Sequence, residues 1–128
     1  MKIRIWDNEQ KRMLEWNELR TKPLWRIVSM CRNKQRYVLM YATDRILQGR
    51  TVYQGDILLT KDGYNVLVRY GSYLAYVPDK DRYETEYGFY LVSLTDESAP
   101  LPVEVIDNCI ALAGNEHYGE MTTAGLLL

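Results

Sequence analysis

The run Val52-Tyr53-Gln54-Gly55-Asp56-Ile57-Leu58-Leu59 lies at the centre of this chain's strand pattern and joins two extended segments through one glycine. Gly55 has no Cβ, so the backbone can bend there or take a positive φ, and the Asp56 carboxylate can accept hydrogen bonds from turn amides. After it, Ile57 and Leu59 recur with the two-residue period of a half-buried strand. The run therefore predicts a corner between two strands.

The composition indicates one small β-rich domain. A chain of 128 residues with 47% hydrophobic and 26% charged residues can bury a core, which excludes disorder as the main state. Eleven tyrosines against one phenylalanine are typical of partly solvent-exposed strand surfaces, where the ring packs and the hydroxyl reaches water. We expect a single domain over residues 1–128, with residues 117–128 as a tail.

The N-terminus has no apolar run of the secretory type, and no later segment approaches membrane-spanning length. The two cysteines lie far apart and form no metal-binding or redox motif. These features predict a cytoplasmic protein with reduced thiols and no membrane partner.

The net charge of −1 conceals a division along the chain. Residues 1–50 carry twelve Lys and Arg against five Asp and Glu, a net charge of +7, whereas residues 51–128 carry four against twelve, a net charge of −8. A basic half can attract phosphates or an acidic partner. The alternative interpretation is that the two halves neutralise each other within the fold or between subunits.

The first half of the sequence predicts two hairpins. Residues 2–6 and 13–16 favour an opening hairpin, and a helix from residue 8 is the alternative. After Pro23, residues 24–30 alternate as a strand does, the basic residues 32–36 resemble a turn, and residues 37–41 resemble a second strand. The tip of this second hairpin contains three candidate contacts for an acidic partner: Arg32, Lys34 and Arg36. Arg69, later in the chain, is a fourth candidate.

The second half predicts a meander of short antiparallel strands. After a loop over residues 43–51, strands over 56–60, 64–70 and 73–77 are separated by an Asp-Gly turn and by Gly71-Ser72. The elements expected after these are a charged loop over 78–86, a strand over 87–94, a linker over 96–102, a strand over 103–106 and helical turns over 108–114. The predicted fold is mainly β, either an SH3-like barrel or a strongly bent antiparallel sheet, with short helical segments near both termini.

Three short motifs follow one another along the chain: Ile5-Trp6-Asp7, then Gly49 ahead of Tyr53-Gln54-Gly55-Asp56-Ile57, and Val105-Ile106-Asp107-Asn108. Their order and spacing resemble the YopX-like family of small phage and prophage proteins. The chain departs from the family pattern at Gln54, at Asp107 and in residues 42–44. The resemblance implies a phage-encoded SH3-related barrel without catalytic residues, in which the shared positions are structural: Trp6, Asp7, Gly49, Tyr53, Gly55, Asp56, Ile57, Val105, Ile106 and Asn108.

The residues that could carry catalysis are few. His117 is the only histidine and lies in the predicted tail, and neither Cys31 nor Cys109 has a histidine near it in sequence. Asp56 and Asp62 could pair on a metal, but each adjoins a glycine and is better explained as a turn residue. We expect no enzyme activity, metal or cofactor.

A binding module is the favoured function. Strand tyrosines beside Arg69 could stack on nucleic acid bases. However, a protein with a pI of 5.8 does not have the excess of positive charge that nucleic-acid-binding proteins usually carry. The favoured partners are a second copy of the chain or a host or phage protein, and nucleic acid is the alternative. The two kinds of partner would be distinguished by whether seven basic residues form one continuous face, as nucleic acid would require: Arg26, Arg32, Lys34, Arg36, Arg45, Arg50 and Arg69.

Overall fold

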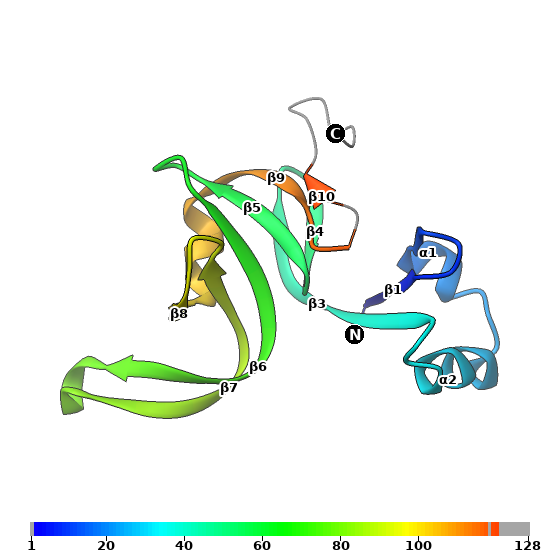
Figure 1. The fold of residues 1–128 in the computed structure, drawn as a ribbon, viewed down its shortest axis with the longest axis horizontal. Helices are drawn as coiled ribbons and strands as arrows, with labels where there is room; N and C mark the ends of the chain where they lie inside the picture. The colour runs from blue at the N-terminus through cyan, green and yellow to red at the C-terminus, as the bar shows by residue number, and fades with distance from the viewer. Residues whose placement is uncertain (1, 118, 121–128) are drawn as a thin grey trace. The chain divides into compact units, whose positions relative to one another are not determined.

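The computed structural model describes residues 2–117 and 119–120, and the chain is mainly β, as its sequence predicts (Figure 1). It has two compact units, residues 1–42 and residues 43–128. That the two form a single domain stays a prediction. None of the described helices has the length and apolar character needed to cross a membrane.

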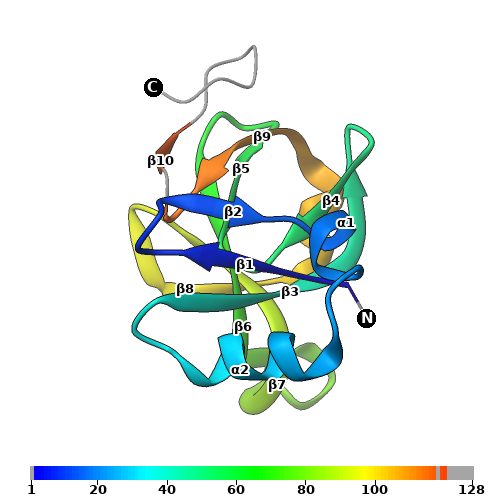
Figure 2. The same ribbon diagram turned by 90° about the vertical axis from the view of Figure 1, so that its right-hand side faces the viewer.

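The first unit is built on β1 (Ile3–Asp7), which pairs antiparallel with β2 (Arg12–Leu14) on one side and with the first part of β3 (Tyr37–Leu47) on the other. Figure 2 shows these three strands side by side. Two helices connect β2 to β3: α1 (Trp16–Leu19) and α2 (Leu24–Arg32). The opening hairpin is thus confirmed, and α1 follows it directly.

The predicted strand over residues 24–30 is wrong, because this segment is the helix α2. Pro23 immediately precedes the helix, a position where its fixed φ and missing N–H cost no intrahelical hydrogen bond. Met30 and Cys31 then pack against Ile5 and Leu14 of the opening hairpin. The basic residues 32–36 are consequently the helix end and the turn into β3, and they do not form the tip of a hairpin.

The second unit contains a strongly curled, half-barrel sheet with the strand order β10-β9-β5-β6-β7-β8. Its pairing is irregular between β5 and β9 and again between β7 and β8, and such register shifts increase local twist. The strands and 3-10 helices of this unit are β4 (Arg50–Tyr53), β5 (Asp56–Thr60), β6 (Asn65–Val77), η1 (Pro78–Lys80), β7 (Arg82–Ser93), β8 (Asp96–Pro102), η2 (Val103–Asn108), β9 (Cys109–Asn115) and β10 (Gly119–Glu120).

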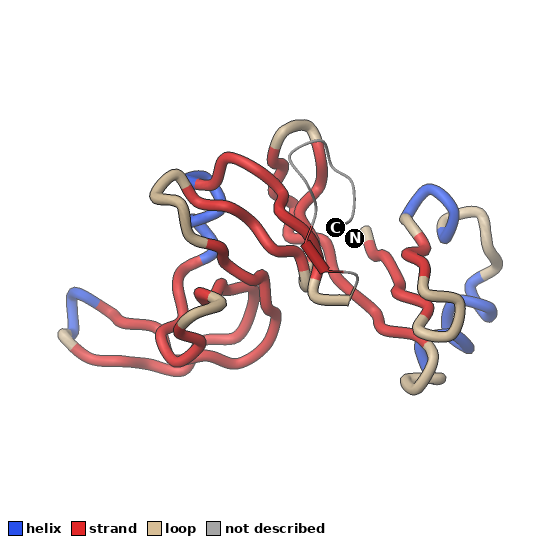
Figure 3. The backbone as a smooth tube through the Cα atoms, turned by 45° about the horizontal axis from the view of Figure 1, so that its top comes forward, coloured by secondary structure: helices blue, strands red, loops and turns tan. Residues whose placement is uncertain are grey.

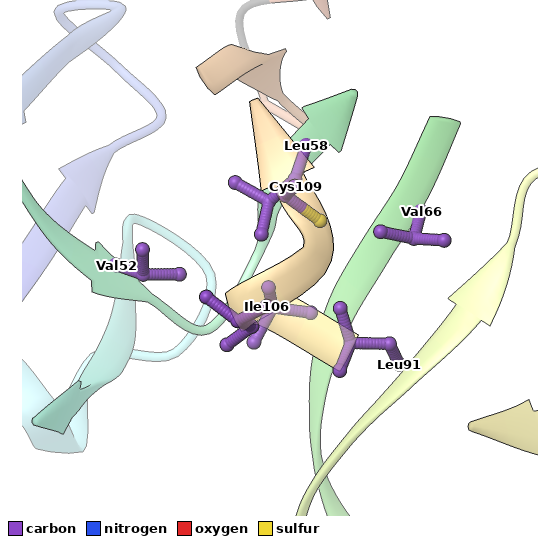
Figure 4. Packing of buried hydrophobic residues seen from close by; sticks show 7 residues of the cluster. Val52, Leu58, Val66, Leu91, Ile106 and Cys109 are labelled. Carbon is purple, nitrogen blue, oxygen red and sulfur yellow. The ribbon is translucent and has the colours of Figure 1, made fainter. Parts of the chain in front are cut away.

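The core of the second unit draws on strands and on η2. Val52 of β4, Leu58 of β5 and Ile106 of η2 are almost fully buried in it (Figure 4). Val66 and Val68 of β6, Leu91 of β7 and Cys109 of β9 complete the cluster. The 3-10 helix therefore contributes a core residue and is part of the barrel's packing.

The predicted corner at Gly55 is confirmed. Gly55 has a φ of +90°, and its N–H donates to the carbonyl of Val68 at 2.8 Å. The fully buried Asp56 carboxylate accepts hydrogen bonds from the Tyr53 N–H at 2.8 Å and from the Asn115 side-chain amide at 3.2 Å. This hydrogen bonding ties β4, β5 and β9 together, so the central motif has a structural role.

In the second half of the chain, several elements differ in type or in bounds from those that the sequence predicts. The loop over 43–51 is the hairpin of β3 and β4, and β6 continues through Gly71-Ser72 without a turn. The charged segment 78–86 is mostly β7, the linker 96–102 is β8, the strand 103–106 is 3-10 helix, and the helical segment 108–114 is mostly β9. The charged segment 78–86 can be mostly strand because the outer part of β6 and β7 is a two-stranded ribbon, whose side chains reach water on both faces. Of the predicted tail, residues 118 and 121–128 lie outside the described residues.

Candidate functional site

The outer part of the β6–β7 hairpin is a two-stranded ribbon, which we call the arm (residues 72–87). Its ladder runs without interruption from Ser72 opposite Tyr87 to Val77 opposite Arg82. The pairing of β5 with β6 ends at Leu67, and β8 pairs with β7 only from Tyr90 onward. Figure 3 shows the long hairpin with the short η1 helix at its tip.

The two faces of the arm differ in charge. One face combines three opposed pairs with no charged side chain: Ser72 with Tyr87, Leu74 with Thr85, and Tyr76 with Tyr83. This uncharged face is exposed: Leu74, Tyr83 and Tyr87 keep 57%, 67% and 73% of their surface accessible. The opposite face carries Glu86, Glu84 and Arg82. An apolar row so exposed is typical of an interaction surface.

The uncharged face continues the row of side chains that forms the core. Along β6, Val66 and Val68 lie in the core, and two-residue alternation puts Tyr70 and then Leu74 on the same face. The Tyr70 ring contacts the rings of Phe89, at 4.7 Å between centroids, and of Tyr87, at 5.4 Å. The apolar row thus leaves the core and becomes exposed along the arm.

Two features set the geometry of the arm. At its base Gly71 lies opposite Gly88, with φ values of +150° and +153° that favour glycine. At its tip the Tyr76 hydroxyl donates to Asp81, which raises the pKa of Tyr76, and Lys80 and Arg82 both bind the Glu84 carboxylate. The charges near the tip are therefore largely paired within the arm itself.

The first unit contains a pocket of about 390 Å³ between β1, β2 and the two helices. Trp25, Ser29 and Asn33 line it from α2 and its C-terminal end, and Gln10 and Tyr37 line it from the strand side. Four basic side chains also line the pocket: Arg12, Lys22, Arg26 and Arg36.

Asp7 organises one side of this pocket. Its carboxylate accepts hydrogen bonds from Arg36 Nε at 3.2 Å and Arg36 Nη2 at 3.1 Å, and from the backbone amides of Glu9 and Gln10. The bonds to Arg36 hold the pKa of Asp7 below its usual value. Asp7, a position of the family pattern, is therefore buried and satisfied by its neighbours.

The three predicted contact residues of the first unit differ in their surroundings. Arg32 and Lys34 are exposed at the end of α2 and do not line the pocket, whereas Arg36 is bound by Asp7 and Glu9. Arg69 belongs to the second unit, where it lines a shallow depression with Tyr73 and Tyr90, whose rings stack at 4.6 Å. That Arg32, Lys34, Arg36 and Arg69 contact an acidic partner stays a prediction.

One further residue proposed as a discriminator, Arg45, has acidic partners within its own unit. Arg45 forms ion pairs with Asp107 at 3.1 Å and Glu104 at 3.9 Å. The sequence pattern did not indicate Lys22 and Trp25 as site residues. Helical spacing after Pro23 was the signal that could have found Trp25, because it puts residues 25 and 29 on one side of α2.

Of the candidate catalytic groups, Cys31 belongs to the first unit, and Cys109, Asp56 and Asp62 belong to the second. Burial raises the pKa of the Cys31 and Cys109 thiols, and Cys109 Sγ donates to the carbonyl of Val105 at 3.4 Å. Asp62 is exposed in a turn while Asp56 is buried. Across residues 2–117 and 119–120, no three His, Cys, Asp or Glu side chains gather as metal ligands would.

Comparison with known proteins gives no relative: no family model, curated protein or solved structure matches the chain. The resemblance to the YopX-like family stays a prediction. The arm and the pocket are therefore the features of the molecule that bear on its function.

Proposed function

We propose that this protein is a non-catalytic binding module that associates with a second copy of itself through the arm. The observation that carries the proposal is the uncharged, exposed face of Leu74, Tyr76, Tyr83 and Tyr87 on a ribbon of only two strands. A two-stranded hairpin in water is marginally stable, and its apolar face is buried only when further strands or a second layer cover it. A partner that covers this face would supply that layer.

A second copy suits this face better than a charged partner does. In a two-fold dimer the same patch meets itself, so a face without charged side chains buries no unpaired charge. Glu84, Glu86 and Arg82 lie on the opposite face and would remain in water. Capture of a host or phage protein through the same face is the other outcome of the test, and phage origin and a cytoplasmic location stay predictions.

The test is the molar mass of the full chain in solution, by light scattering or sedimentation equilibrium. We expect a dimer whose dissociation constant rises at least roughly tenfold in the double variant Leu74→Glu, Tyr83→Glu, because two charges would be buried in the apolar contact. The matched control is Ile46→Glu, Ile110→Glu, which changes two exposed apolar side chains of the same unit outside the arm.

The control variant should dimerise as the parent does. A parent chain that stays monomeric at high concentration contradicts self-association. A dimer that both double variants weaken equally contradicts the assignment to the arm.

Nucleic-acid binding is the second candidate, and one observation supports it. Residues 1–42, which form the first unit, carry ten Lys and Arg against four Asp and Glu, a net charge of +6. A compact unit with that excess of positive charge attracts phosphates, in a manner that weakens with salt.

A further inference from the structure

The pocket of the first unit holds more positive charge than its own carboxylates neutralise. Arg12 is paired with Glu18 at 2.6 Å, and Arg36 is paired with Asp7. Lys22 and Arg26 line the same pocket, and neither forms an ion pair within the part of the chain that the structure describes. Two cations without a carboxylate partner are an arrangement that attracts an anionic group.

An exposed aromatic ring lines the pocket with these cations. Trp25 adjoins Arg26 in the first turn of α2, and 69% of its surface is accessible. Tyr37 also lines the pocket, with the Arg36 guanidinium 5.0 Å from its ring centroid. Because an indole presents a flat apolar surface, a planar ring that stacks on Trp25 would remove that surface from water.

The pocket also has the size and polar groups of a small-molecule site. Its volume of about 390 Å³ lies within the range typical of ligand pockets. Ser29, Asn33 and Gln10 supply hydrogen-bonding groups along its wall. A ligand that meets all of these features combines an anionic group, a planar ring and polar edges.

We propose that this pocket binds a nucleotide unit, with the phosphate on Lys22 and Arg26 and the base stacked on Trp25. The site shares no residue with the arm, so it goes beyond self-association and either proposal can fail without the other. The nucleotide can be free or part of a single strand. The chemistry that the pocket recognises is the same in both cases.

The experiment uses the full chain and three small probes: adenosine monophosphate, adenosine and inorganic phosphate. Calorimetric titration should show that the nucleotide binds at least roughly tenfold more tightly than either of its parts, because base stacking and phosphate pairing each contribute. Anisotropy of a labelled eight-nucleotide single strand, with the free nucleotide as competitor, distinguishes the two sources. Displacement of the strand only at saturating nucleotide assigns the site to a strand, whereas displacement near the nucleotide's own dissociation constant assigns it to the free nucleotide.

Two double variants separate the pocket from the general charge of the unit. Lys22→Glu, Arg26→Glu should weaken nucleotide binding at least roughly tenfold, because the phosphate loses both cations. Arg32→Glu, Lys34→Glu makes the same change in net charge in the same unit, on exposed residues that do not line the pocket. This control should change binding less than about threefold at physiological salt, where screening weakens distant charges.

Trp25→Ala tests the base. Because Trp25 is exposed, the variant should keep the parent's circular dichroism spectrum, and its affinity for the nucleotide should fall toward that for inorganic phosphate. Equal losses in the two double variants would overturn the site, since general charge attraction would then explain binding. Absence of nucleotide binding even at low salt would overturn it as well.

Discussion

At the scale of single residues, Gly55 is where the backbone conformation most restricts the sequence. Its φ of +90° is costly for a β-branched side chain, and its N–H and carbonyl both form backbone hydrogen bonds, to Val68 and from Glu116. Gly55→Val should therefore lower the free energy of unfolding by about 1–3 kcal/mol or more, measured by urea denaturation.

The matched control for this variant is Gly63→Val. Gly63 has nearly the same φ, +91°, but lies in an exposed turn with open space around the position of a Cβ. It should show the conformational cost alone, so its loss should be the smaller one. A Gly55→Val variant that unfolds at the parent's urea midpoint would show that the corner is not required.

Asp7 is a residue whose ionisation should affect stability at acid pH. Its folded-state pKa is lowered from 3.8 by the Arg36 hydrogen bonds, so its contribution to stability is complete above that value and is lost as the pH falls below it. Asp7→Asn should be less stable than the parent at pH 7, and the difference should shrink below pH 3.8. Urea denaturation from pH 7 to pH 2 measures this.

The exposed turn residue Asp62 provides the control, as Asp62→Asn. A gap between parent and Asp7→Asn that stays constant down to pH 2 would contradict the assigned role of the carboxylate.

At the scale of elements, the sequence predicts a strand, hairpin or turn correctly where residues close together in the chain determine it. The Gly55 corner, the opening hairpin and the turn at Asp62-Gly63 each follow from residues close together in the chain. The helix α2 could not be predicted in this way, because the residues from Leu24 to Met30 also alternate in the manner of a strand. Only the packing of Met30 and Cys31 on the opening hairpin selects the helix. Tertiary contacts override local propensity in such segments.

The arm shows why the candidate surface was only partly predictable. The sequence correctly predicts that Tyr76 and Tyr87 lie on strands. However, Gly71-Ser72 is typical of a turn, so the sequence predicts two short strands where the structure has the single strand β6. The ladder in which Gly71 lies opposite Gly88 keeps the strand continuous, and it thereby aligns Leu74, Tyr76 and Tyr83 on one face. Which residues share a face depends on register, and register depends on partners far along the chain.

At the scale of the whole molecule, the division of charge coincides with the division into units. Residues 1–42 carry a net charge of +6, and residues 43–128 carry six Lys and Arg against thirteen Asp and Glu, a net charge of −7. Two routes to self-association follow from this. One joins the basic unit of one copy to the acidic unit of another, and the other joins two arms through their uncharged faces.

Salt distinguishes the two routes. Attraction between oppositely charged units is screened at 1 M salt, where the Debye length is about 3 Å. Burial of an apolar face persists, and sulfate strengthens it. We expect the dimer measured by sedimentation equilibrium to remain in 1 M sodium chloride and to tighten in 0.5 M ammonium sulfate. Dissociation to monomers in sodium chloride would assign the contact to the charged units and would remove the arm as the site of association.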